Sequence, residues 1–210
     1  MVIENKIIRQ PKGSQLCGPA CLAMAMEMLG NSVSLKQIAK SLTISKDFGI
    51  GLFDLAAYPA KQGFQVDLYA WDAEHFPLRW REMDSEQLIA DLERQSLRKG
   101  GWRACLLEEL KMGSRFFPKP ISTREMEKRL ADGQQMILYV DSAVLYEHAD
   151  GVWGHYVILH KTGRNTWTII DPHWKYGGLR RYQKDLLLFA FYRLGGYCLF
   201  LSKKKARSRR

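Results

Sequence analysis

The pattern of apolar and polar positions predicts helices in the first half of this chain and strands in the second half. An apolar, helix-favouring run after Pro19 predicts a buried helix that begins at Cys17 and ends before Gly30. The remaining pattern predicts helices at 35–42, 51–62, 84–98, 105–111 and 125–131, and strands at 2–9, 64–71, 135–140, 155–161, 166–170 and 197–202. An α+β fold is therefore expected, with helices packed on a mainly antiparallel sheet.

Cys17 has the surroundings of a reactive thiol. It stands at the first position of the expected helix, where the partial positive charge of the helix N-terminus stabilises a thiolate. Gly18 permits close approach of the backbone, and Pro19 fits the first helical turn, where a missing N–H costs no hydrogen bond. Cys17 is therefore the candidate nucleophile, whereas Cys21, one turn later, is expected in the core.

A predicted hairpin supplies the two other groups that a thiol nucleophile needs. His155 begins the strand 155–161, and Asp171 directly follows the strand 166–170. Antiparallel pairing brings the open ends of a hairpin together, so the two side chains are expected to be neighbours. An imidazole beside a thiol acts as its base, and a carboxylate beside the imidazole fixes its tautomer and stabilises its charged form.

A zinc site is the alternative use of the same residue types. Cys17, Cys21, His155 and His173 make up a Cys2His2 set of ligands that suits zinc. Both cysteines, however, lie on an apolar helix and not on the tight loops that hold structural zinc. We therefore expect no metal and no cofactor, and we interpret His173 either as part of the substrate cleft or as a surface residue.

Three segments resemble those of a known peptidase family. The runs from Gln15 to Met24, from Gly154 to Leu159 and from Ile170 to Pro172 are similar, in order and spacing, to blocks of the papain-like bacteriocin-processing leader peptidases, family thirty-nine among the cysteine peptidases. The blocks cover less than a quarter of the chain. The resemblance implies a papain-like α+β fold and hydrolysis of an amide bond through an acyl-enzyme.

The resemblance also implies a role for each site residue. It places the nucleophile on Cys17, the base on His155 and the orienting acid on Asp171. The family carries a glutamine a few residues before the cysteine, and the amide of this glutamine helps to bind the oxyanion. Gln10 matches this position best, with a spacer one residue longer than usual, whereas Gln15 lies nearer to the nucleophile.

We expect a thiol-dependent hydrolase that cleaves a peptide or amide bond in a peptide or protein substrate. An acyltransferase that uses the same thiolate is one alternative, and a catalytically inactive peptide-binding relative is another. The segment 71–120 matches nothing in the resembled peptidases, so the choice of substrate does not carry over from them, and cleavage after paired glycines is one possibility. The resemblance implies a peptide with small residues at the cleavage site, whereas Trp153, Trp174 and Tyr176 near the expected cleft favour an aromatic or extended partner; the sequence leaves both open.

Length and composition fit one domain. A chain of 210 residues with 46% hydrophobic residues buries a sizeable core, and we expect a single domain over 1–202 with an insertion at about 71–120. No apolar run reaches the roughly 18 residues of a membrane span, and the N-terminus lacks a secretory signal. The scattered cysteines fit a reducing compartment, so we expect a freestanding, soluble cytoplasmic protein.

The positive charge is concentrated at the C-terminus. The formal net charge is +10, and residues 203–210 contain six basic side chains, without which the net charge falls to about +4. We expect a disordered, solubilising tail, with contact to an anionic partner such as RNA or lipid as the alternative. The rest of the chain shows no motif with the spacing of a nucleic-acid-binding module.

Overall fold

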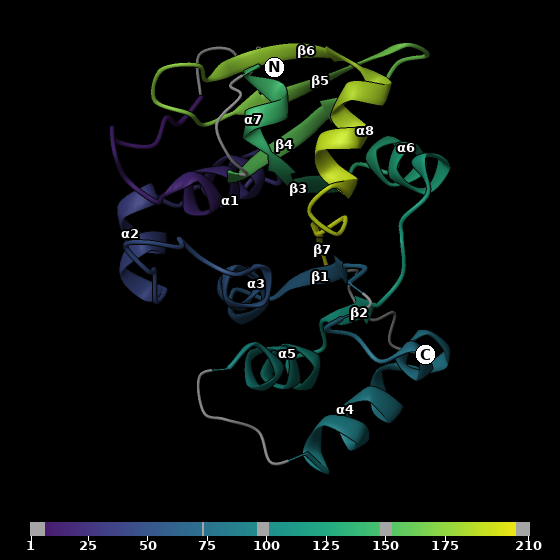
Figure 1. Cartoon of the computed structure of the whole chain (residues 1–210). Coiled ribbons are helices and arrows are strands. Elements are labelled where there is room, and N and C mark those ends of the chain that lie inside the picture. Colours follow the sequence, from purple (N-terminus) through teal and green to yellow (C-terminus); the bar gives the residue numbers. More distant parts are fainter. Residues whose placement is uncertain (1–6, 73, 96–100, 148–152, 205–210) are drawn as a thin grey trace, which may run out of the picture.

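A seven-stranded sheet forms the centre of the computed structural model, which describes residues 7–72, 74–95, 101–147 and 153–204 (Figure 1). The strand order is β2-β1-β7-β3-β4-β5-β6, and every neighbouring pair is antiparallel except β1 with β2. The strands are β1 Phe64–Tyr69, β2 Arg115–Phe117, β3 Gln135–Asp141, β4 Gly154–Lys161, β5 Thr166–Asp171, β6 Gly178–Gln183 and β7 Cys198–Lys203. The predicted α+β class with a mainly antiparallel sheet is confirmed.

Helices cover both faces of this sheet (Figure 1). Helices α1 and α3 lie on one face, α6 and α8 lie on the other, and α4 and α5 lie beyond the β2 edge. The helices are α1 Cys17–Met28, α2 Leu35–Ser41, α3 Leu52–Lys61, α4 Ser85–Glu93, α5 Trp102–Lys111, α6 Thr123–Ala131, α7 Ser142–Leu145 and α8 Lys184–Tyr192, with a 3₁₀ helix, η2, over Leu78–Glu82. In these parts of the chain, none of the helices combines the length and apolarity needed to span a bilayer.

The central strands carry apolar side chains on both faces. Alternate residues of each strand belong to two separate hydrophobic clusters, one under α1 and α3 and one under α8. The first cluster includes Ile137, Tyr156, Ile158 and Leu199, and the second includes Leu138, Val157, Leu159 and Phe200. Because both faces are buried, these strands appear in the sequence as continuous apolar runs.

Some predicted boundaries were wrong. The helix predicted over 84–98 ends at Glu93, and its last predicted residues lie outside the described part of the chain. Residues 7–9 of the predicted first strand are not strand, and 2–6 lie outside the described residues. The backbone there forms hydrogen bonds to a side chain and a loop and does not pair with a strand. The N–H of Ile8 donates to Met24 Sδ at 3.2 Å, and the N–H of Gln10 donates to the Pro172 carbonyl at 2.8 Å.

The segment predicted as an insertion continues the main core. Phe76 and Phe116 pack edge-to-face on Phe53 of α3, and the ring of Trp102 stacks on Phe53 from α5. Strand β2 extends the sheet by parallel pairing with β1. On these contacts we propose that 71–120 folds as part of one domain with the rest of the chain. The predicted disordered tail over 203–210 began too early, because Lys203 is the last residue of β7 and pairs with Phe64; residues 205–210 lie outside the described part of the chain.

A buried acid in α5 predicts pH-dependent stability. Glu109 is 1% exposed; its Oε2 accepts a hydrogen bond from Ser114 Oγ at 2.9 Å, and its Oε1 has no partner among the described residues. Burial raises the pKa of this carboxyl to about 7. Folding therefore favours the protonated form, and this stability is lost as the pH rises from about 4.3 through 7.

Glu109→Gln should remove this dependence. In urea-unfolding experiments, we expect the free energy of unfolding of the variant, relative to that of the parent, to be about 2 kcal/mol higher at pH 8 than at pH 5. Glu108→Gln, on the exposed side of the same helix, is the control and should follow the parent at both pH values. An equal difference between Glu109→Gln and the parent at pH 5 and pH 8 would show that Glu109 is ionised in the folded protein throughout this range.

Candidate active site

Cys17 is the first residue of α1, and within the described part of the chain no side chain caps the start of this helix. Leu16 at the N-cap has no polar side-chain atom, and the first helical N–H to bond back belongs to Ala20, at 2.9 Å from the Leu16 carbonyl. Gly18 packs closely, because a Cβ at this position would lie 3.1 Å from side-chain carbons of both Ile50 and Tyr156. The half-buried thiol therefore stands at an uncapped helix N-terminus.

The hairpin of β4 and β5 places His155 beside Asp171. Ile158 pairs with Ile170, and this register continued by one residue sets Asp171 opposite Val157, two positions from His155. Residues two apart on a strand share a face, so the two side chains meet diagonally. His155 Nε2 lies 2.9 Å from Asp171 Oδ1.

Asp171 is fully buried and accepts three hydrogen bonds from the described residues. Oδ1 accepts from His155 Nε2 and from the backbone N–H of His173 at 2.8 Å, and Oδ2 accepts from Tyr146 Oη at 2.6 Å. Burial alone would raise the pKa of this carboxyl, but the hydrogen bond and charge of His155, with the other donors, lower it. Asp171 therefore remains an anion next to the imidazole.

Cys17 and His155 stabilise each other in their charged forms. Burial raises the pKa of the Cys17 thiol, but the hydrogen bond and charge of His155 and the backbone N–H groups of Tyr156 and Gly18 outweigh burial and lower it. Burial lowers the pKa of His155, yet its hydrogen bonds to Asp171 and Cys17 raise it to about 10. Because Nε2 is bonded to Asp171, Nδ1 is the ring nitrogen left for Cys17. The electrostatics favour a thiolate–imidazolium pair at neutral pH.

A loop after β5 places His173 against this group. The His173 ring lies 5.9 Å from that of His155 and stacks on Tyr176 at 4.9 Å. Its Nδ1 accepts the backbone N–H groups of Lys175 and Tyr176, at 3.1 and 2.9 Å. Burial and the charge of His155 both lower the pKa of His173, so this ring is neutral beside the imidazolium. Of the two interpretations of His173, the structure supports a place at the site.

Gln10 lies near this loop but makes a local side-chain contact. Its side chain is 9% exposed, and Nε2 donates to the Ser14 carbonyl at 2.9 Å, while its backbone N–H binds the Pro172 carbonyl. Gln15 is exposed and lies beside Gly49. The structure thus brings Cys17, His155 and Asp171 into one hydrogen-bonded group, and it ties the backbone of Gln10 to Pro172, the residue after Asp171.

Cys21 belongs to the core. Its Sγ lies 3.3 Å from the Tyr156 carbonyl, and burial, together with the charges of Cys17 and Asp171, raises the pKa of this thiol. Within the described ranges, no three histidine, cysteine, aspartate or glutamate side chains are arranged to hold a metal ion. All four cysteines are free thiols.

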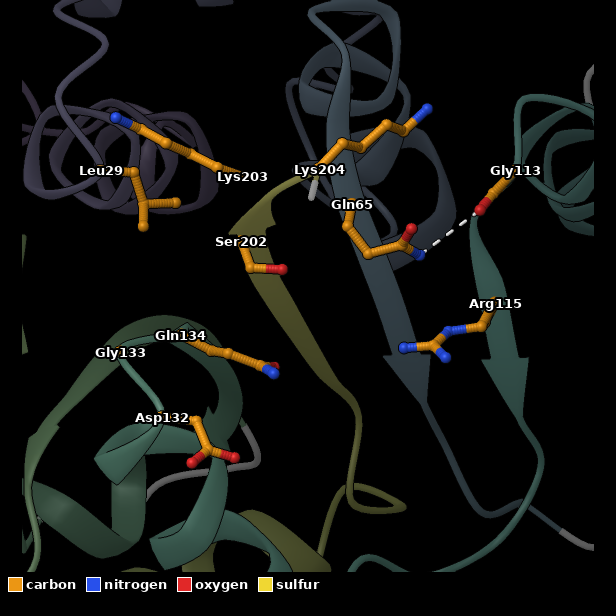
Figure 2. A pocket seen from close by; sticks show the side chains of 10 residues that line it. All are labelled: Leu29, Gln65, Gly113, Arg115, Asp132, Gly133, Gln134, Ser202, Lys203 and Lys204. Carbon is orange, nitrogen blue, oxygen red and sulfur yellow. Dashed lines mark hydrogen bonds between the residues drawn. The ribbon is translucent and has the colours of Figure 1, made fainter. Parts of the chain in front are cut away.

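Two cavities differ in their relation to Cys17. An apolar cavity of about 440 Å³ is lined by Leu16, which directly precedes Cys17, and by Pro11, Leu35, Lys36, Ala39 and Lys40. A larger cavity of about 1230 Å³ is lined by Leu29, Gln65, Arg115 and Lys203, among others (Figure 2). Leu29 directly follows α1 and lies about 18 Å from Cys17 along the helix. The smaller cavity is therefore the one with a lining residue next to Cys17 in the chain.

Sequence reasoning missed two tyrosines around the site. Tyr146 follows the four-residue helix α7, which carries no periodic pattern. Tyr139 covers Gly154, where a Cβ would lie only 1.6 Å from the tyrosine hydroxyl. The glycine before His155 was the available signal for this close approach.

The comparisons with known proteins agree with this fold. The Peptidase C39 family model matches residues 4–96, a segment that includes Cys17 and ends before His155 and Asp171. No curated protein matches the chain.

Two solved structures share the fold at low sequence identity. One is the peptidase domain of Streptococcus ComA, a bifunctional ABC transporter involved in a quorum-sensing pathway, with a TM-score of 0.51, 15% identity and coverage of 94% of this chain and 97% of that one. The other is described as a C39-like peptidase from Bacillus anthracis, with a TM-score of 0.59, 13% identity and 98% coverage of both chains. The fold is therefore that of the papain-like C39 peptidases, as the sequence resemblance predicted.

Proposed function

We propose that this protein is a cysteine peptidase in which Cys17 is the nucleophile, His155 the general acid and base, and Asp171 the residue that orients His155. The observation that carries the proposal is the continuous hydrogen-bonded group of these three side chains at the start of α1. The match to the Peptidase C39 family and the shared fold support the same class of activity.

The reaction follows from the charges of this group. The Cys17 thiolate attacks the substrate carbonyl carbon, and the carbonyl oxygen becomes an oxyanion. His155 gives its proton to the leaving amine as the C–N bond breaks, which leaves an acyl thioester on Cys17. Water then attacks the thioester with His155 as its base, and the acid product and the thiol are released. Asp171 stays ionised throughout and keeps Nδ1 directed at the sulfur.

The oxyanion has two candidate donors. One is the backbone N–H of Cys17 at the helix start, where the dipole also favours negative charge. The other is the Gln10 amide: one N–H of Nε2 binds the Ser14 carbonyl, so the second remains for an oxyanion.

Gln10→Ala should lower kcat about 10²-fold, because one oxyanion donor is removed, while alkylation of Cys17 stays at the parent rate. Gln15→Ala is the matched control and should keep parental turnover. The assignment of Gln10 fails if both variants turn over alike, or if only the Gln15 variant is impaired.

We propose that the substrate is a peptide that lies between the apolar cavity beside Leu16 and the exposed rings of Trp153 and Trp174. The test is incubation with a peptide mixture in ¹⁸O-labelled water, followed by mass spectrometry. A peptidase yields new C-termini that carry ¹⁸O. Products that are joined to an added amine and lack ¹⁸O would instead identify an acyltransferase. Peptides that bind to the protein but are not cleaved would identify a peptide-binding protein.

A further inference from the structure

Tyr146 holds the oxygen of Asp171 that His155 does not use. Its hydroxyl donates to Oδ2 at 2.6 Å, while Oδ1 receives His155 and the backbone of His173. The Tyr146 ring also lies 5.3 Å from the His173 ring and 4.9 Å from the Tyr176 ring. Because both oxygens of the carboxylate accept hydrogen bonds, the carboxylate is held in one orientation, and the direction of its hydrogen bond to His155 is fixed.

Asp141 forms hydrogen bonds both to α7, which Tyr146 directly follows, and to the residue before β4, the strand that contains His155. Its Oδ1 accepts the N–H of Ala143 in α7 at 3.0 Å and that of Trp153, just before β4, at 3.2 Å. Arg193 pairs with its Oδ2 at 3.0 Å. The fully buried Asp141 therefore sets the distance between α7 and the start of β4.

The backbone after Tyr146 is strained. Glu147 has φ +56°, in the left-handed region that residues other than glycine seldom adopt. Such strain persists where the surrounding structure fixes a conformation, and it gathers at functional sites. Here the turn lets the chain leave α7 while the Tyr146 hydroxyl stays on Asp171.

We propose that Tyr146 is a positioning residue that acts through Asp171: it fixes the carboxylate and supplies the buried Oδ2 with a donor, so that Asp171 stays ionised and aimed at His155. This inference rests on the proposed function. Without the hydroxyl, Oδ2 would be a buried carboxylate oxygen with no donor among the residues that the structure describes, and such an oxygen is costly while it is charged. Asp171 would then take up a proton at higher pH, and a neutral Asp171 no longer stabilises the imidazolium.

Several other titratable or charged groups surround Asp171. They are Cys17 and Cys21 from α1, His155 from β4, His173 after β5, and Arg180 and Tyr182 from β6. Of these, only Cys17 and His155 form the proposed ion pair. Asp171 helps to hold the proton on His155, so a lowered pKa of His155 reports a weakened carboxylate.

The test is NMR titration of the His155 ring in Tyr146→Phe. We expect His155 to lose its proton at a pH about one unit lower than in the parent, because the carboxylate that holds this proton is less well fixed. Tyr192→Phe is the matched control, since its hydroxyl donates to the Ile121 carbonyl away from the site. The control should keep the parental His155 titration.

The outcomes separate this inference from the proposed function. A parental His155 titration in Tyr146→Phe, with Cys17 still activated, overturns the role of Tyr146 and leaves the peptidase proposal standing. A parent protein in which Cys17 is not activated overturns both. Thermal melting checks that each variant is folded. If Tyr146→Phe is not folded, the same titration in Tyr146→Leu, which also lacks a donor, replaces it, and an unchanged His155 titration overturns the role.

Discussion

Cys17→Ala is expected to lower the rate of peptide cleavage by at least about 10⁴-fold. Without the thiolate, no acyl-enzyme forms, and the remaining oxyanion donors supply only the residual rate that removal of a nucleophile leaves. Cys21 cannot replace it, because its sulfur is buried against the Tyr156 carbonyl and its pKa is raised. The fold should survive, since alanine is the best helix former. The measurement is release of ¹⁸O-labelled products, with thermal melting beside it.

Cys21→Ala is the control for this substitution. It removes a thiol one helical turn away, and its turnover should stay within about threefold of the parent, because its role is core packing. Cleavage that persists in Cys17→Ala but disappears in Cys21→Ala would transfer the nucleophile to Cys21 and overturn the assignment.

Asp171→Asn is expected to lower kcat by about 10²-fold or more and to narrow its pH range from the alkaline side. The amide keeps the shape of the carboxylate but removes the charge that helps to raise the pKa of His155 to about 10. The imidazolium then loses its proton at lower pH, and proton donation to the leaving amine stops earlier as the pH rises. The measurement is kcat from pH 5 to pH 10.

Asp132→Asn, an exposed carboxylate in the turn between α6 and β3, is the control and should reproduce the parental profile. An alkaline limb in Asp171→Asn that coincides with the parental one would mean that Asp171 does not hold the proton on His155. In that case the pKa of His155 would have to be raised by Cys17 alone.

The proximity of Cys17, His155 and Asp171 was predictable because local signals place these residues in the fold. Gly18 and Pro19 mark the helix start at Cys17. His155 and Asp171 lie at the open end of the β4–β5 hairpin, whose two strands follow each other in the sequence and pair directly. Neither step needs knowledge of how distant elements pack.

The missed elements depend on tertiary packing. Helix α8, with its run from Leu186 to Phe191, is apolar on every side, so its pattern does not distinguish helix from strand. Strand β6 is a mostly polar edge strand, stabilised by pairing with β5 and not by burial. Tyr146 reaches Asp171 only because Asp141 fixes α7 against the start of β4, and no spacing along the chain encodes this contact.

The pH dependence of Cys17 alkylation, with peptide mapping, tests the central claim most directly. Cys105 is an internal reference, because burial and its hydrogen bond to Asp54 raise the pKa of its thiol to about 12. We predict that Cys17 reacts at pH 6 while Cys105 does not, and that His155→Ala slows Cys17 at this pH by at least about tenfold. A Cys17 that reacts only above pH 8.5, or at the same rate in His155→Ala, would contradict the thiolate–imidazolium pair and the peptidase proposal with it.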